Sequence, residues 1–508
     1  MDKLHSYEIL DYRRCPKMLW LNHDRYEAWL ELGYEVVIED EVEWDPVDYV
    51  DNHTALHNAA KRAFDPGGIG INIESVGTEE DCLHASGQAL ADGTRPVFYS
   101  SIATGDMSSC VQVMVPERLN GTLQWHAICL TPRTSIGGVE RDKAAIISYL
   151  AHEIGLPLAS ISVVHINGDF IRDRSGCDDG LLIRVDLTKE SESRRGEVVQ
   201  WLSDARATIC RKHEPFMETG DQCHAPDECR FIGYCDRNRP TPKFPFVQLP
   251  QSHPLRQAMI KEFEVNEPNE IAAELLDTIT RRIKECVASG RPYFDVDSAA
   301  AEMAHYEYPA RFLHFDAISL AIPYWRGTRP YQQVPYHFGM KILMTESQTT
   351  YRSYLNANPD DPFYDCARYL VRQCGTQGPI FVYQAQHVMQ ILQGLAEQCP
   401  ELDGQLTSIQ NRLVDLLPIA RRHYYHPRQN RSWALGALLP AICPGAAYRE
   451  LNVWHEDFFS PNHAIQRLIA GDAGQDEQAH LNHRLMAYGE VCAMALVRVW
   501  KALKEGNL

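Results

Sequence analysis

The sequence lacks an excess of positive charge. Its 49 lysine and arginine residues stand against 68 aspartate and glutamate residues, which gives a net charge of −19. Proteins that bind nucleic acid non-specifically neutralise its phosphates with lysine and arginine. The composition therefore argues against broad binding to nucleic acid, although it is compatible with a local basic groove. It favours protein partners.

Long apolar runs are missing as well. No stretch of the chain is apolar over the length needed to span a bilayer, and the residues after Met1 contain no apolar segment of the kind found in secretory signals. We therefore expect a cytoplasmic protein without membrane association. The 15 cysteines are an odd number in a long chain without an export signal, so we expect thiols or metal ligands rather than a disulfide framework.

The residue pattern predicts an α/β protein of several domains. A chain of 508 residues is long enough for two to four domains, and the proline-rich stretch 237–254 is the clearest linker. We predict a first domain over 1–240, a linker and helical bridge over 241–305, and a second domain over 306–508. In the first domain, strands are expected at 96–102, 111–115, 123–130, 161–166 and 181–187, and helices at 7–32, 53–64, 140–154 and 192–212.

The second domain has the same mixed pattern. Apolar, β-branched and aromatic residues predict its strands, and amphipathic periodicity predicts its helices. The strands are expected at 311–315, 336–344 and 380–383, and the helices at 362–374, 385–397, 403–417 and 478–504.

Three evenly spaced cysteines are the clearest candidate for a metal site. Five residues separate Cys223 from Cys229, and five separate Cys229 from Cys235, in a segment rich in turn residues. Thiolates at such spacing can hold three corners of a zinc ion or an iron–sulfur cluster. Cys15 is our candidate for the fourth ligand. The spacing alone does not separate zinc from iron–sulfur or from plain buried thiols.

Several segments carry a resemblance to known nucleases. Residues 13–21, together with the three late cysteines, resemble the RecB/Cas4-like iron–sulfur nucleases of the PD-(D/E)xK class. The second half resembles the RNase H-like (DEDD-type) exonuclease domain that is fused to them in an uncharacterised bacterial family. The segments that carry this second resemblance are 312–323, 327–335, 412–418, 424–427 and 432–433. The resemblance implies a 4Fe–4S cluster on the four cysteines, with zinc as the alternative.

The first nuclease-like site is degenerate where the resemblance can be checked. Such enzymes carry an upstream histidine, an aspartate on one strand and Glu-x-Lys on the next. His57 matches the histidine, but Gln112 or Val113 occupies the place of the aspartate. Cys129 and Thr131 stand at the positions of the glutamate and the lysine. Losing the acids and the lysine together leaves nothing to hold Mg²⁺.

The second nuclease-like site is degenerate too. The resemblance implies Asp-x-Glu on the strand 311–315 and its continuation, where this chain has His314 and Asp316. Cys492 stands at the place of a later aspartate, while Asp415 is retained. A two-metal site needs several convergent carboxylates, so we expect no catalytic Mg²⁺. A zinc site made of His314, Asp316 and Cys492 is a less favoured alternative.

A segment near residue 425 mixes cations with aromatic residues. This combination can stack nucleic-acid bases and neutralise phosphate, but it is equally consistent with a solvated loop anchored by its aromatic rings. The candidates for local nucleic-acid contact are Arg421, Arg422, Tyr424, Tyr425, Arg428 and Arg431.

These features predict a catalytically inactive nuclease-like protein. It would serve as a scaffold or recognition subunit in a bacterial nucleic-acid-processing or anti-phage defence complex. One alternative is a divergent metal-dependent exonuclease that uses Asp316, Asp415 and Glu490 as its remaining acids. Another is a decoy or inhibitor that occupies the interface of a partner nuclease.

Overall fold

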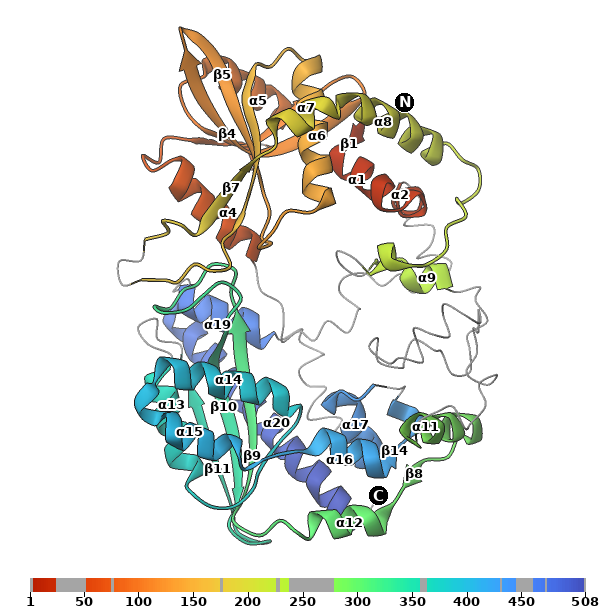
Figure 1. The fold of residues 1–508 in the computed structure, drawn as a ribbon, viewed down its shortest axis with the longest axis vertical. Helices are drawn as coiled ribbons and strands as arrows, with labels where there is room; N and C mark the ends of the chain where they lie inside the picture. Colours follow the sequence, from red (N-terminus) through yellow and green to blue (C-terminus); the bar gives the residue numbers. More distant parts are fainter. Residues whose placement is uncertain are drawn as a thin grey trace. The chain divides into compact units, whose positions relative to one another are not determined.

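The computed structural model describes the chain as two compact α/β units (Figure 1). The first unit contains residues 1–42, 51–236 and 320–331, and the second contains 43–50, 237–319 and 332–508. None of the described helices is long and apolar enough to cross a membrane. The described residues are 3–23, 52–74, 77–173, 177–224, 229–236, 278–356, 363–429, 432–444, 460–470 and 473–506.

Two predictions fall partly on the remaining residues. The first 37 residues of the predicted bridge, 241–277, lie outside the described residues, and so does the end of the first predicted helix, 24–32. The described part of the bridge contains helices α11 (Thr278–Ser289) and α12 (Val296–Met303), both in the second unit.

A seven-stranded mixed sheet forms the centre of the first unit. Its strands follow the order β2-β3-β4-β5-β6-β7, and β1 pairs with β4 in parallel. Buried and partly buried side chains alternate along β3 from Phe98 onward, as expected of a strand with one face on a core. The bounds are β1 (Leu4–His5), β2 (Ile71–Asn72), β3 (Val97–Ala103), β4 (Met107–Leu119), β5 (Thr122–Leu130), β6 (Leu158–Ile166) and β7 (Leu182–Asp186).

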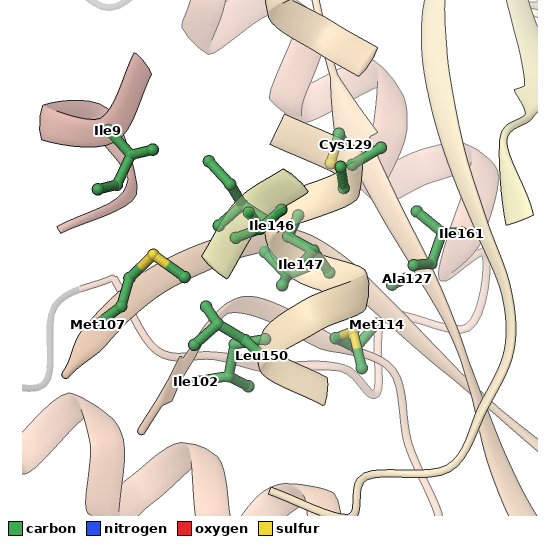
Figure 2. Close-up of a cluster of buried hydrophobic side chains, with 14 of the residues drawn as sticks. Ile9, Ile102, Met107, Met114, Ala127, Cys129, Ile146, Ile147, Leu150 and Ile161 are labelled. Carbon is green, nitrogen blue, oxygen red and sulfur yellow. The ribbon is translucent and has the colours of Figure 1, made fainter. Parts of the chain in front are cut away.

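Helix α6 (Gly138–Glu153) contributes several buried side chains to the core of this unit. Its residues Ile146, Ile147 and Leu150 are fully buried, and Figure 2 shows them among side chains of the sheet such as Met107 and Met114. The other described helices of the unit are α1 (Ser6–Arg14), α2 (Pro16–Asn22), α4 (Asn52–Phe64), α5 (Glu79–Asp92), α7 (Thr188–Ser193), α8 (Arg195–Ile209) and α9 (Ile232–Asp236).

The predicted helix 7–32 is wrong as one element, because it breaks at Cys15. Cys15 is extended, with φ −162° and ψ 115°, and helix α2 begins at the next residue, Pro16. Proline has no backbone N–H and disfavours helical geometry in the residue before it. The break places the Cys15 side chain at the junction between α1 and α2.

A five-stranded mixed sheet forms the centre of the second unit. Its order is β11-β10-β9-β12-β13. Strands β11, β10 and β9 pair antiparallel, whereas β12 is parallel to β9 and to β13. The bounds are β9 (Ala310–Ser319), β10 (Gln333–Leu343), β11 (Thr349–Leu355), β12 (Ile380–Val382) and β13 (Leu413–Asp415).

Helices cover both faces of this sheet (Figure 1). The ring of Phe338 on β10 lies 5.9 Å from that of Tyr369 on α13, while its neighbour Gly339 lies against Gly489 of α20. Successive strand residues point to opposite faces, so α13 and α20 lie on different sides. The described helices are α13 (Tyr364–Cys374), α14 (Ala385–Gln398), α15 (Asp403–Gln410), α16 (Leu416–His423), α17 (Leu435–Ile442), α19 (Pro461–Ala470) and α20 (Gln475–Glu505).

The predicted helix 403–417 is also wrong beyond its first half. Helix α15 ends at Gln410, and Leu413–Asp415 form strand β13 before α16 begins. Strand β13 is only three residues long, too short for the period of its apolar residues to separate strand from helix.

Helix α20 and strand β10 approach each other at two glycines. A Cβ atom on Gly339 would lie 2.4 Å from the carbonyl oxygen of Gly489, and a Cβ on Gly489 would lie 1.9 Å from Cε1 of His337. Any larger residue would push the helix off the sheet or displace the imidazole. These glycines therefore set the distance between α20 and the sheet.

The substitution Gly489→Ala tests this close approach. The added methyl group must displace His337, so we expect the second unit to lose about 1–3 kcal/mol of unfolding free energy. The matched control is Gly394→Ala in helix α14, where a Cβ meets nothing within 4 Å. There the change should stabilise the helix by about 0.5–1 kcal/mol. Urea unfolding followed by circular dichroism measures both, and equal effects would contradict the packing described.

Candidate functional site

Asp316 lies between two imidazoles at the centre of the second unit. Its Oδ1 is 2.9 Å from Nε2 of His314, and its Oδ2 is 2.7 Å from Nδ1 of His337. The carboxylate is almost wholly buried, with 1 % of the side chain exposed. Both carboxylate oxygens are therefore engaged by ring nitrogens of the protein itself.

The two strands that carry these residues explain their meeting. His314 and Asp316 are two residues apart on β9, so their side chains lie on one face of the sheet. His337 on β10 stands directly opposite Asp316, after a β-bulge between Pro335 and His337. The bulge inserts an extra residue and thereby changes which side chains of β10 share the face of Asp316.

Helix α20 closes the other side of this group. Gly489 lies against the ring of His337, and the ring of Tyr488 lies 6.0 Å from that of His314. Cys492, one turn further along the helix, acts electrostatically on His314. The ring nitrogen Nε2 of His337 is buried and has no hydrogen-bond partner among the residues that the structure describes.

The charges of this group are coupled. Burial alone lowers the pKa of His314, but Cys492 and Asp316 together outweigh it and raise this pKa well above its usual value. Burial alone raises the pKa of Asp316, and His314 and His337 overcome that effect and lower it. Asp316 is therefore an anion at neutral pH, held beside an imidazolium.

The other two acids proposed as metal ligands in this unit also bond to groups of the protein itself. Asp415 accepts hydrogen bonds from the backbone N–H groups of Gln384, Ala385 and Leu417, at 3.1, 2.9 and 3.0 Å. It caps helix α16 and joins it to the start of α14. Glu490 pairs with Lys341, whose Nζ lies 2.8 Å from its Oε1. Both carboxylates thus hold protein groups together.

In the first unit, His57 lies within a set of polar side chains around β3 and β4. Its Nδ1 is hydrogen-bonded to the hydroxyl of Tyr99, a residue with a φ of 57°. Burial lowers the pKa of His57 and raises that of Tyr99 to about 12. The side-chain oxygen Oε1 of Gln112 is buried and has no partner among the described residues. Gln112 provides an amide here where a metal site would require a carboxylate.

The positions expected to hold Glu-x-Lys are both buried. Cys129 is part of the apolar core, and burial raises its pKa. The hydroxyl of Thr131 donates to Oε1 of Glu140 at 3.1 Å. Glu140 in turn accepts from the backbone N–H of Gly137 at 2.8 Å, which caps helix α6. The acid that is bonded to Thr131 thus serves the start of a helix.

The structure brings the four candidate cluster cysteines together. Cys223 and Cys229 are buried in one small apolar cluster, and Cys15 and Cys235 pack against it. Burial raises the pKa of Cys235 to about 11, and Cys15 acts on it electrostatically. Among the described residues, however, no group of three or more His, Cys, Asp or Glu side chains has the arrangement of a metal site.

Arg13 and Arg14 at the end of α1 fix this helix beside the cysteines. Arg13 and Arg194 both pair with Asp142, at 2.9 and 2.6 Å, and both guanidinium groups lie over the ring of Trp201. Arg14 donates to the carbonyl of Gln222 at 2.9 Å. The segment around Cys15 is thus tied to α6, to α8 and to the residue before Cys223.

The segment of cations and aromatic residues is mostly structural in the described part of the chain. Tyr424 and Tyr425 are fully buried in the short strand β14 (Tyr424–Tyr425), which pairs with β8 (Tyr293–Phe294), so neither ring offers a face to a base.

The arginines of this segment differ in their surroundings. Arg422 pairs with Glu302. Arg421 lies over the ring of Trp433 at 5.5 Å. Arg428 stays exposed, and Arg431 lies outside the described residues.

Sequence analysis missed His337, which completes the site around Asp316, and Lys341, which pairs with Glu490. Both lie in the predicted strand 336–344, and their spacing of four places them on the same face of a strand. That alternation was a usable signal. Their partners, Asp316 on β9 and Glu490 on α20, lie on other elements, so the sequence of this strand alone does not identify them.

The comparison with known families covers part of the second unit and the segment 320–331 of the first. Residues 311–434 match the family described as a domain of unknown function, DUF2779. This span includes His314, Asp316, His337 and Asp415, whereas Cys492 lies beyond it. No curated protein matches the chain.

The raised pKa of His314 predicts how stability depends on pH. Because the folded state binds this proton more tightly, its contribution is complete below about pH 6.5 and is lost as the pH rises through the folded value. The Asp316 contribution has the opposite sign and is lost in acid. The difference in unfolding free energy between the wild type and His314→Gln should therefore shrink above pH 6.5, by at most about 1.4 kcal/mol per pH unit.

Urea unfolding between pH 5 and 9 measures this difference. The control is His480→Gln on the exposed face of α20, whose difference from the wild type should stay nearly constant. A His314→Gln difference that is equally constant would show that His314 is not protonated in the folded protein.

Proposed function

We propose that the protein is a catalytically inactive, nuclease-like scaffold or recognition subunit of a bacterial nucleic-acid-processing or anti-phage defence complex. The observation that carries this proposal is the pairing of Asp316. Its two oxygens lie 2.9 and 2.7 Å from ring nitrogens of His314 and His337. A divalent ion at this carboxylate would have to displace at least one imidazole and would lie beside the charge on His314.

The arrangement of the second sheet supports an RNase H-like fold for this unit. Three antiparallel strands are followed by two parallel strands in the order β11-β10-β9-β12-β13, as expected of that fold. His314 and Asp316 lie on its central strand, β9. In the first unit, the mixed sheet with α6 packed on it is consistent with the proposed PD-(D/E)xK-like fold.

The other acids support a non-catalytic role. Asp415 caps backbone N–H groups, and Glu490 pairs with Lys341. A two-metal site needs carboxylates that converge on the ions, and here each carboxylate is directed to a protein partner. The net charge of −19 further favours protein partners over nucleic acid, with any nucleic-acid contact local.

We also propose a metal cofactor, a 4Fe–4S cluster with zinc as the alternative, on Cys15, Cys223, Cys229 and Cys235. Their shared apolar cluster and the soft character of thiolates support this site. Burial raises the pKa values of Cys229 and Cys235, and the charges of Arg14 and Lys17 oppose this effect in part. Their positive charges would help to hold the thiolates that a cluster requires. Such a cofactor would fasten the first helices to the end of the unit.

The proposed inactivity predicts the outcome of a nuclease assay. The full chain, incubated with single- and double-stranded DNA and RNA in Mg²⁺ or Mn²⁺, should cleave no faster than an Asp316→Asn variant prepared in the same way. Titration with Mg²⁺ should leave the melting temperature unchanged. If Mg²⁺ did bind the folded protein, a concentration of 100 times its Kd would raise the unfolding free energy by about 2.7 kcal/mol. Metal-dependent cleavage that disappears in Asp316→Ala would overturn the proposal.

The cofactor proposal predicts a coloured protein. Anaerobic purification should give a brown sample with broad visible absorption, and Cys15→Ala should remove the colour and destabilise the first unit more than the second. The control is Cys210→Ala, which replaces an exposed cysteine of the same unit. This variant should keep the colour and the stability of the first unit. Elemental analysis that finds zinc alone would identify the cofactor as zinc instead of an iron–sulfur cluster. A protein without bound metal would contradict the proposed site.

A further inference from the structure

A serine, a histidine and a glutamate form a chain of hydrogen bonds across three strands of the first sheet. Oγ of Ser160 on β6 lies 2.7 Å from Nδ1 of His126 on β5. Nε2 of the same imidazole lies 3.1 Å from Oε2 of Glu117 on β4. A hydroxyl, a base and an acid that orients the base are the parts of an activated nucleophile. The function proposed above does not use them.

The register of the strands produces this arrangement. Ser160 and His126 are direct partners on the parallel strands β6 and β5. The partner of Glu117 is Gln124, which lies two residues before His126, so Glu117 and His126 share one face of the sheet. Ala127, the next residue of β5, belongs to the core that α6 fills. The chain of hydrogen bonds therefore lies on the opposite face.

The direction of each proton follows from the partners. The Glu117 carboxylate can only accept, so Nε2 of His126 carries its proton, and Nδ1 of the neutral imidazole is then free to accept. Arg184 on β7 can only donate, and its Nη2 lies 2.9 Å from Oγ of Ser160. The Ser160 proton is therefore directed at Nδ1 of His126, the nitrogen that can remove it.

Arg184 supplies a positive charge beside this hydroxyl. Its Nε donates to Oγ of the buried Ser162 at 2.7 Å, which fixes the guanidinium. A cation held at this point stabilises negative charge that develops on a substrate oxygen. Solvent reaches the group, since Arg184 is exposed and the side chains of His126 and Glu117 are 25 % and 48 % exposed. An open, polar surface of this kind suits a short ester better than a long apolar one.

We propose that Ser160 hydrolyses short carboxylic esters with His126 as its base, and that Glu117 positions His126. The Ser160 proton passes to Nδ1 of His126 as Oγ bonds to the carbonyl carbon, and Arg184 stabilises the resulting oxyanion. The C–O bond to the alcohol then breaks, and the alcohol takes the proton from Nδ1. Water attacks the acyl-serine, gives a proton to His126 and releases the carboxylic acid, and Ser160 regains its proton.

This site is separate from the nuclease-like position of the same unit. Cys129 lies three residues after His126 on β5 and belongs to the core on the other face of the sheet. The inactivity proposed above concerns cleavage of nucleic acid only. Either proposal can therefore fail without the other.

The first test needs no variant. The full-length protein is incubated for timed intervals with a biotinylated fluorophosphonate, which loses fluoride to the hydroxyl of an activated serine, and the labelled peptides are quantified by mass spectrometry. Ser193 is the internal reference, because it is an exposed serine of the same unit whose hydroxyl donates to the carbonyl of Glu190. Ser160 should be labelled at least about tenfold faster than Ser193. An equal or lower rate would refute the proposal.

The second test assigns the roles through hydrolysis of p-nitrophenyl acetate. Ser160→Ala should lose the activity, whereas the matched control Ser193→Ala should keep it. His126→Gln should lower kcat by at least about 100-fold. Glu117→Asp, which keeps the charge, should retain more activity than Glu117→Gln, which keeps the shape, whereas a merely structural role predicts the reverse order. Hydrolysis that persists in Ser160→Ala, or labelling of Ser160 that is unchanged in His126→Gln, would contradict the proposed mechanism.

Discussion

The second unit is organised around the cost of burying one carboxylate. An isolated anion in a protein interior is strongly unfavourable unless charge and hydrogen bonds compensate it. Asp316 receives both from His314 and His337. This requirement fixes the register of β9 against β10, and the ring of His337 then requires a glycine on the helix above it. One buried charge thus constrains two strands and the longest described helix, α20.

The same arrangement uses carboxylates in a way that competes with metal binding. A catalytic metal site keeps its anionic oxygens directed at an open position, where the ion collects them. Here Asp316 is directed at imidazoles, Asp415 at backbone N–H groups and Glu490 at Lys341. The first unit follows the same pattern, because Asp142 binds Arg13 and Arg194 and Glu140 caps its own helix. Acids in both units stabilise the protein by pairing internally.

The sequence predicted most central strands because their apolar runs are long and clearly bounded. Those expected at 311–315 and 123–130 lie within β9 and β5. It failed where a feature depends on distant partners. The bulge before His337 and the short strand β13 depend on neighbouring strands, and the burial of Tyr424 and Tyr425 depends on β8. The loop Leu320–Tyr331 lies between two strands of the second unit, yet it belongs to the first.

That loop shows how local contacts decide such an assignment. Arg172 donates to the carbonyl of Pro323 at 2.8 Å, and its backbone N–H donates to the carbonyl of Thr328 at 3.0 Å. The side chain of Asn52 accepts from the backbone N–H of Ala321 at 2.9 Å. Buried backbone groups need such partners. The three groups that bond to the loop here belong to Arg172 and Asn52, both residues of the first unit. The loop's own sequence gives no sign of them, because each partner is more than 100 residues away.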